Sequence, residues 1–135
     1  MSKVYALSIK QPWATLLVAG KKTIEVRSWS TRIRGRVLIH AARIPDPRPE
    51  AWQWITDELR PLTELGGGII GEAELCACVA YPDSERFVAD VSRHLNEPAW
   101  FQERGLFGFR FQNATALPFR SLPGNVRFFT VEEPQ

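Results

Sequence analysis

The stretch AGKKTIEVRSWSTRIRGRVLIHAA, residues 19–42, carries the pattern on which the fold prediction rests. Apolar residues occupy the even positions of 23–27, which is the alternation of a half-buried strand. Thr23, Glu25 and Arg27 are therefore expected on one face of that strand, because every second side chain points the same way. The stretch thus predicts a strand that presents opposite charges side by side.

The residues on either side predict short strands mixed with helices. Pro12 suits the first turn of a helix and Gly20 suits its end, while the proline-rich segment 44–49 is expected to be a loop. We expect strands over 4–9, 23–27, 37–42, 66–79 (with a bulge at Gly71), 106–111 and 126–131, and helices over 12–19, 50–60 and 83–96. These elements do not alternate as regular strand–helix units. They predict an α+β fold, a small, mostly antiparallel β-barrel with flanking helices.

The composition is that of a folded domain. The chain has 135 residues, of which 44% are hydrophobic and 24% are charged, so it can bury a core. It contains no apolar run of about 18 residues, the length of a membrane-spanning helix, and its first residues do not resemble a secretory signal. We expect residues 1–135 to form a single domain that is cytoplasmic and has no membrane partner.

Metal-binding side chains are few. The chain has two cysteines, Cys76 and Cys78, and two histidines, His40 and His94. A zinc site needs about four such ligands close together, whereas two cysteines in a reducing compartment commonly serve as small buried hydrophobes. We predict no metal site and no cofactor.

The net charge of +2 is unevenly distributed. Residues 1–36 carry eight lysines and arginines against one acid, and residues 37–135 carry nine against fourteen acids. A basic surface beside an acidic body suits a polyanionic partner such as RNA or another single-stranded nucleic acid, with DNA as an alternative. A solvated, lysine-rich surface without a ligand would give the same count.

Glu25 and Lys22 each have more than one possible role. Glu25 could orient an arginine through a salt bridge, accept a hydrogen bond from a base edge, or act as a general base. Lys22 could bind a phosphate, or it could act as a base or nucleophile if burial or neighbouring cations lower its pKa. The residues alone leave these alternatives open.

The surrounding cations and aromatic residues suggest a cleft. Arginines can bind phosphates bidentately and indoles can stack on bases, although Trp13 on an apolar helix face and His40 in an apolar strand also suit a core. If strands 23–27 and 37–42 are neighbours, the arginines and His40 would line one cleft with Glu25. The binding candidates are Lys10, Trp13, Lys21, Lys22, Glu25, Arg27, Trp29, Arg34 and Arg36, and the catalytic candidates are Lys22, Glu25 and His40.

Three segments together resemble a known family. LSIKQPWA at 7–14, GKKTIEVRSW at 20–29 and RGRVLIHAA at 34–42 are similar to the activating signal cointegrator homology (ASCH) domain. That family is marked by a G-x-K-x-x-E-x-R pattern, which the chain matches with Gly20, Lys22, Glu25 and Arg27. The segments 68–79 and 108–131 resemble the family's later strands.

The resemblance implies a PUA-like fold, RNA binding and, in some members, DNA binding at a cleft lined by the motif. Some small bacterial members resemble amidohydrolases that deacetylate N4-acetylcytidine, and others are ribonucleases. The catalytic lysine of the deacetylating branch matches Lys22, a threonine of that branch falls at Glu25, and its carboxylate could correspond to Glu85 or Glu97. A modified nucleoside is therefore a further possible ligand.

A third possibility is a module that binds a small ligand or a protein. The predicted helices at 50–60 and 83–96 are amphipathic and could dock on a protein, but no partner can be named from their sequence.

Overall fold

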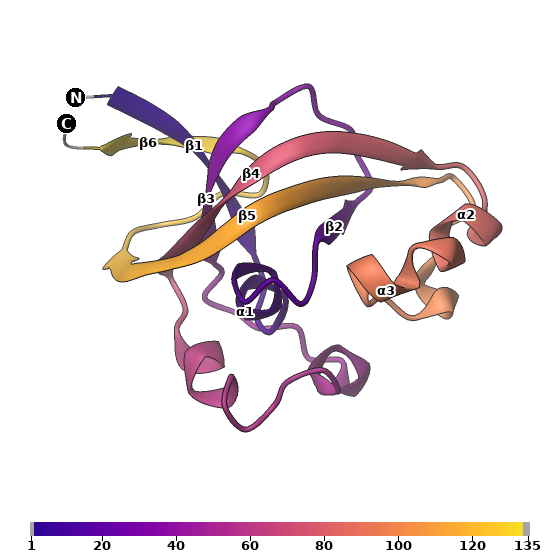
Figure 1. Cartoon of the computed structure of the whole chain (residues 1–135), viewed down its shortest axis with the longest axis horizontal. Helices are drawn as coiled ribbons and strands as arrows, with labels where there is room; N and C mark the ends of the chain where they lie inside the picture. The colour runs from indigo at the N-terminus through magenta and orange to yellow at the C-terminus, as the bar shows by residue number, and fades with distance from the viewer. Residues whose placement is uncertain (1, 134–135) are drawn as a thin grey trace.

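The computed structural model describes residues 2–133, which form one six-stranded sheet with short helices around it (Figure 1). The strands are β1 (Ser2–Ile9), β2 (Ile24–Arg27), β3 (Gly35–Ala41), β4 (Gly68–Tyr81), β5 (Leu106–Ser121) and β6 (Phe129–Glu133). The α-helices are α1 (Trp13–Val18), α2 (Ser84–Ala89) and α3 (Val91–His94), and 3-10 turns span Pro49–Trp52, Arg60–Glu64 and Pro98–Trp100. None of the helices within residues 2–133 is long and apolar enough to cross a membrane.

The strand order is β2-β5-β4-β3-β1-β6. The β1–β3 pair is parallel and every other neighbouring pair is antiparallel. The predicted α+β class, with a mostly antiparallel sheet and flanking helices, is confirmed. Pairing between the described strands leaves β2 and β6 at the two edges, so the sheet curls as a loose barrel that backbone hydrogen bonds do not close.

Bulges account for the curvature of the sheet. The register between β4 and β5 shifts at Ile69/Gly71, at Glu72/Glu74 and at Leu75/Ala77, and additional residues on one strand of a pair bend and twist it locally. The first shift includes Gly71, where a bulge was predicted. A Cβ atom at Gly71 would lie 2.6 Å from the Thr115 carbonyl oxygen, so the bend also requires a residue without a side chain.

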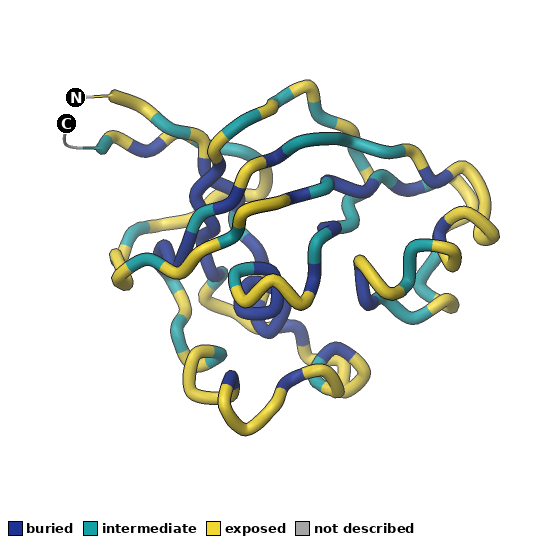
Figure 2. Tube along the Cα trace, in the orientation of Figure 1, coloured by how far each residue is buried: buried dark blue, intermediate teal, exposed yellow. Residues whose placement is uncertain are grey.

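The core lies between the concave side of the sheet and α1. Trp13, Leu16 and Leu17 of α1 are buried, as their helical spacing predicted, and they belong to one cluster with residues such as Ile39 and Phe109 of the sheet. Figure 2 shows this arrangement as dark blue on α1 and the central strands, with yellow along most of the lower loops. The site described below lies where this core reaches the surface.

The predicted helix over 50–60 is wrong. The chain forms the two 3-10 turns Pro49–Trp52 and Arg60–Glu64 with non-helical turns between them. Pro61, directly after the predicted helix, lacks the backbone N–H that an α-helix continuing past Arg60 would need. Side chains at a spacing of four still face the core, which is why the segment resembles a helix in sequence: Ala51, Ile55 and Leu59.

The predicted helix over 83–96 is two short helices, α2 and α3. Asp83 caps the first by accepting a hydrogen bond from the Arg86 backbone N–H at 2.9 Å. The helical geometry ends at Asp90, whose carboxylate accepts a hydrogen bond from the Tyr81 hydroxyl at 2.6 Å. The break turns the end of α3 toward β2, where it becomes part of the candidate site.

The last two strands also differ from the prediction. β5 continues to Ser121, ten residues beyond the predicted end at Phe111, and β6 begins at Phe129. β5 pairs with β2 only through Phe107–Arg110, so its later part has a free edge on that side. Pro118 lies in this later part, where the missing N–H costs no pairing with β2.

Candidate ligand-binding site

Lys22 is directed into the protein by the turn that follows α1. Gly20 has φ of 78°, the left-handed conformation that glycine adopts easily, and the backbone N–H groups of Lys21 and Lys22 both donate to the Leu16 carbonyl oxygen. The Lys22 side chain is only 1% exposed. Its Nζ donates to the His94 carbonyl oxygen at 2.6 Å and lies 4.7 Å from the centre of the Trp13 ring.

The end of α3 provides the acceptor for Lys22. Leu95 follows the helix in the left-handed conformation, with φ of 62°, which is unusual for a residue with a side chain. The Thr23 N–H donates to the Arg93 carbonyl oxygen at 2.9 Å, so the same helix end also anchors the start of β2. Together these bonds fix where the Lys22 amine lies.

Glu25 lies between Lys22 and Arg27. Its Oε1 is 3.5 Å from the Lys22 Nζ, and its Oε2 is 3.1 Å from the Arg27 Nε. The Arg27 Nη2 also donates to the Ser8 carbonyl oxygen at 2.8 Å. Because β2 and β1 are not neighbours in the sheet, this bond joins β2 to β1 across the open side of the barrel.

A pocket of about 420 Å³ opens above these side chains. This volume is typical of small-ligand sites, which span about 300–1,000 Å³. Its charged lining residues are four cations and two carboxylates: Lys10, Lys22, Arg27, Arg48, Glu25 and Asp46. The remaining lining residues are Ser8, Trp13, Val26, Ala42, Asn96, Asn125 and Val126.

Asp46 connects the pocket wall to the loop after β3. Its carboxylate accepts a hydrogen bond from the Trp13 Nε1 at 2.9 Å and forms an ion pair with the Arg48 Nη2 at 2.7 Å. Burial alone would raise the pKa of Asp46, but the hydrogen bonds from Arg48 and Trp13 outweigh it and lower the pKa to about 2. The guanidinium of Arg48 in turn lies 3.5 Å from the centre of the Trp100 ring.

The Lys22 amine is easier to deprotonate than an ordinary lysine. Burial lowers its pKa from 10.5 to about 8, although the charge and hydrogen bond of Glu25 act in the opposite direction. Arg27 adds a smaller lowering effect. A fraction of the Lys22 side chains is therefore neutral at mildly alkaline pH, and the group could act as a base there.

The structure brings some predicted site residues together. Lys10, Trp13, Lys22, Glu25 and Arg27 all line the pocket. Trp13 does so from a largely buried position, with 6% of its surface exposed, and Lys10 does so as an exposed side chain.

Other predicted residues lie elsewhere. The condition for a single cleft, that strands 23–27 and 37–42 are neighbours, is not met, because β5 and β4 lie between β2 and β3. Arg36 instead forms ion pairs with Glu72 and Glu133 and does not line the pocket. Arg34 donates to two backbone carbonyl oxygens of its own loop.

His40 is also outside the pocket. Its Nδ1 is 2.9 Å from the Ser8 hydroxyl and its Nε2 is 2.8 Å from the Leu122 carbonyl oxygen. A carbonyl oxygen only accepts, so Nε2 carries a proton, and in the neutral ring Nδ1 accepts from the Ser8 hydroxyl. His40 is 2% exposed and borders a separate hollow that also contacts Gly124.

The remaining candidates do not line the pocket. Lys21 is exposed at the turn after α1. Trp29 packs edge-on against Phe109 and Phe128 and borders a neighbouring hollow. Glu85 and Glu97, the possible counterparts of a catalytic carboxylate, do not line this pocket.

Several pocket residues were not predicted from the sequence. Asp46 and Arg48 lie in the proline-rich loop, and Asn96 follows α3. A pair of opposite charges held between prolines, at 45–49, was the available signal for the first two. No local pattern marks Asn96 or Asn125, which reach the pocket through tertiary structure.

The curled, mostly antiparallel sheet with flanking helices is a PUA-like fold, and the lysine–glutamate–arginine cluster lies at its open side. The sequence model of the ASCH domain matches residues 7–115, and the chain belongs to the ASCH domain family. The proposed resemblance is therefore confirmed. This family is often linked to RNA binding.

Two curated relatives share the same family region. The chain is 33% identical over 105 residues to human "Activating signal cointegrator 1". This alignment covers 72% of this chain and 18% of the human protein. It is also 33% identical over 97 residues to the mouse protein of the same name, and that alignment covers 66% of this chain and 17% of the mouse protein. The chain thus spans less than a fifth of the length of these relatives.

Solved structures support the fold. A crystal structure of ASCH from Zymomonas mobilis has a TM-score of 0.68 and 16% identity, with 96% of this chain and 87% of that chain covered. A crystal structure of a serine-to-alanine mutant of the same Zymomonas mobilis protein has a TM-score of 0.65 and 17% identity, with 96% and 88% covered. At such low identity, these likenesses show the fold alone.

Proposed function

We propose that the pocket binds a nucleotide unit of single-stranded RNA. The observation that carries this proposal is the convergence of Lys22, Glu25 and Arg27 on one open pocket in which cations outnumber carboxylates four to two. Phosphate-directed cations supply most of the affinity of proteins for nucleic acids. A modified nucleoside within the RNA would fit the same pocket.

The carboxylates hold the arginines in position. Glu25 is paired with Lys22 and Arg27, and Asp46 is paired with Arg48 and Trp13. A guanidinium has five N–H donors, so both arginines keep donors for a phosphate. Lys10 is exposed at the rim and can contact a second phosphate oxygen.

The asparagines suit the base. Asn96 donates its side-chain amide to the His94 carbonyl oxygen at 2.9 Å, which leaves its own carbonyl oxygen to accept from a base edge. Asn125 uses its carbonyl oxygen within its own loop and keeps its amide as a donor. A base in the pocket therefore meets both a donor and an acceptor.

The test is the salt dependence of RNA affinity. Contacts from Lys10, Arg27 and Arg48 would give a slope of log K against log salt of about −2, since each phosphate contact on a single strand contributes about −0.7. Affinity for a short single-stranded RNA should then fall about 20-fold between about 50 and about 200 mM salt. A DNA strand of the same sequence tests whether the ribose matters.

Matched variants locate the contact. Lys10→Ala should reduce the slope by about 0.7, whereas Lys21→Ala, which removes an exposed lysine outside the pocket, should leave the slope unchanged. Undetectable RNA binding at low salt, or equal effects of the two variants, would contradict the proposal.

The lowered pKa of Lys22 favours a second candidate function, an enzyme on RNA or on a modified nucleoside. In it Lys22 acts as base or nucleophile, Glu25 orients it, and Arg27 stabilises developing negative charge. Hydrolysis of N4-acetylcytidine and metal-independent RNA cleavage are the reactions to assay. Turnover that survives Lys22→Ala in a pure preparation would end this candidate, with Lys21→Ala as the control.

A further inference from the structure

A second hollow of about 260 Å³ adjoins the main pocket. The two share four lining residues, Val26, Arg27, Arg48 and Asn96, so they are separated only by these side chains. Both arginines therefore face both hollows. A ligand that extends out of the main pocket past Arg27 and Arg48 enters the second hollow.

The charges of the two hollows differ. Glu25 and Asp46 line the main pocket, whereas the lining of the second hollow, among the residues that the structure describes, contains Arg27 and Arg48 and no carboxylate. Glu25 and Asp46 therefore repel a phosphate less on the far side of Arg27 and Arg48 than within the main pocket. The shared wall is the most favourable place for the phosphate that links two nucleotides.

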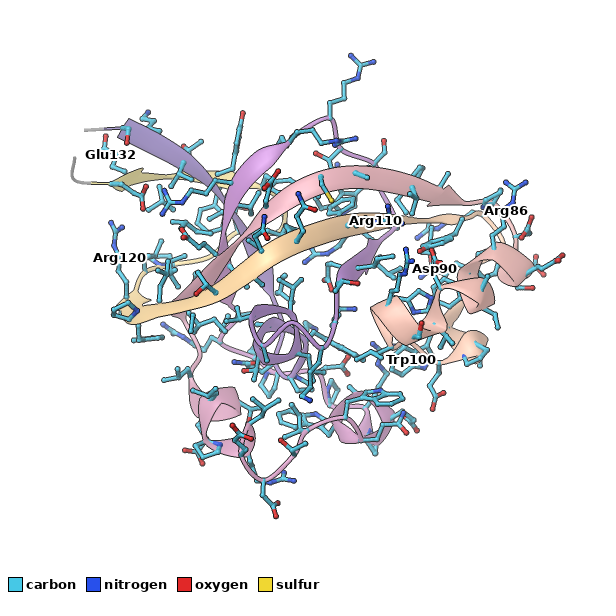
Figure 3. All side chains as sticks on the ribbon, viewed as in Figure 1. Arg86, Asp90, Trp100, Arg110, Arg120 and Glu132 are labelled. Atoms are coloured by element: carbon cyan, nitrogen blue, oxygen red, sulfur yellow. The ribbon has the colours of Figure 1, made fainter. Side chains whose placement is uncertain are left out.

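The second hollow also contains a flat platform. The Arg48 guanidinium stacks on Trp100 at 3.5 Å, and Asp46 holds Arg48 in that position through an ion pair of 2.7 Å. Trp100 contacts Trp13 edge-on, with ring centres 6.1 Å apart. In Figure 3 the labelled Trp100 lies between α3 and the 3-10 turn Pro49–Trp52. Bases stack readily on both indoles and arginine planes.

We propose that the second hollow holds the next nucleotide of the same RNA strand, with its base against the Arg48–Trp100 platform and the linking phosphate at Arg27 and Arg48. This inference rests on the proposed function and deepens it. The preferred ligand is a strand of at least two nucleotides, and a single nucleoside fills only one of the two hollows.

The test compares ligands on the unchanged protein by calorimetry. The four ribonucleoside 3′-monophosphates are measured first, and the best of them is then extended by one nucleotide on its 3′ side. The dinucleotide should bind roughly 5- to 150-fold more tightly, the gain expected from stacking one base. A dinucleotide with an abasic second position should lose most of that gain, because only the phosphate remains. An equal affinity for the full and abasic dinucleotides would contradict the proposed stacking of the second base on the Arg48–Trp100 platform.

A variant pair tests the residue. Trp100→Ala should abolish the gain from the second base, measured as the ratio of dinucleotide to monophosphate affinity in the same variant, because the monophosphate affinity can itself change when Arg48 loses its stacking partner. Trp54→Ala, which removes an exposed tryptophan outside both hollows, should change neither. If Trp100→Ala does not fold, the comparison of full and abasic dinucleotides on the natural chain still tests whether the second base binds the platform. RNA binding without a gain from the second nucleotide overturns this inference alone, and no binding of any ribonucleotide or RNA overturns the proposed function with it.

Discussion

Replacing Lys22 with methionine tests whether its amine is buried as the structure shows. Methionine is unbranched and apolar, so it can follow the path of the lysine stem beside Trp13. The variant leaves no partner stranded. The His94 carbonyl oxygen still accepts from Asn96 at 2.9 Å, and Glu25 still pairs with Arg27 at 3.1 Å. The comparison with the natural chain therefore isolates the ionisation of one group.

The magnitude follows from the pKa of Lys22, which is lowered from 10.5 to about 8. Between these two values the unfolded chain binds more protons than the folded chain, so the stability of the folded protein rises with pH. Below about pH 8 the buried charge costs on the order of 3 kcal/mol of folding stability, at about 1.4 kcal/mol per pKa unit. About 2 kcal/mol of that cost is recovered between about pH 7 and about pH 9.5.

The assay is urea unfolding of the natural chain and of Lys22→Met across that pH range. The free energy of unfolding of the natural chain, minus that of the variant, should rise by about 2 kcal/mol, because other titrating groups are common to both and cancel. Lys21→Met is the control, and its difference should vary much less because the Lys21 amine is exposed. A difference that stays flat or falls with rising pH would refute the burial of the Lys22 amine.

Three further changes test the pocket wall and its surroundings. Trp13→Phe removes the hydrogen bond to Asp46 and should lower the free energy of unfolding by about 1–3 kcal/mol in urea titrations, since a buried carboxylate oxygen loses a donor; an unchanged midpoint would count against that bond. Arg36→Gln should alter stability by less than about 1 kcal/mol and leave RNA affinity unchanged, because its ion pairs are exposed and lie outside the pocket; weaker RNA binding would place the ligand elsewhere on the molecule. Gly71→Ala should cost about 1–3 kcal/mol through the clash with the Thr115 carbonyl oxygen, measured by thermal unfolding, and a neutral result would mean that β5 moves away easily.

Sequence patterns predicted those parts of the site whose residues are close together in the sequence. Alternation over 23–27 places Glu25 and Arg27 on one side of a strand, and the structure pairs them at 3.1 Å. The lowered pKa of Lys22 was not predictable, because it depends on how burial balances against Glu25, and burial is a property of the folded chain. The same holds for Arg48, whose position depends on Asp46 and on Trp100, which lies far away in the sequence.

Strand order was the larger part of the fold that could not be predicted from the sequence. Alternation shows which residues share a face, but it does not show which strands are neighbours. The assumption that consecutive strands pair would have placed β2 beside β3, and with it Arg36 and His40 in the cleft. The structure inserts β5 and β4 between them. The segment 50–60 failed for a related reason, since apolar residues four apart suit a helix and a series of tight turns equally.

The pairing of β2 with β5 affects how the protein is made. The motif is completed by residues that follow it much later in the sequence: Glu25 is opposite Phe109 in the sheet, the Lys22 amine donates to the His94 carbonyl oxygen, and the Phe111 N–H donates to the Thr23 carbonyl oxygen. A nascent chain on the ribosome cannot assemble the motif until residue 111 has emerged. Until then the lysines and arginines of this segment cannot form the cluster that the folded chain shows.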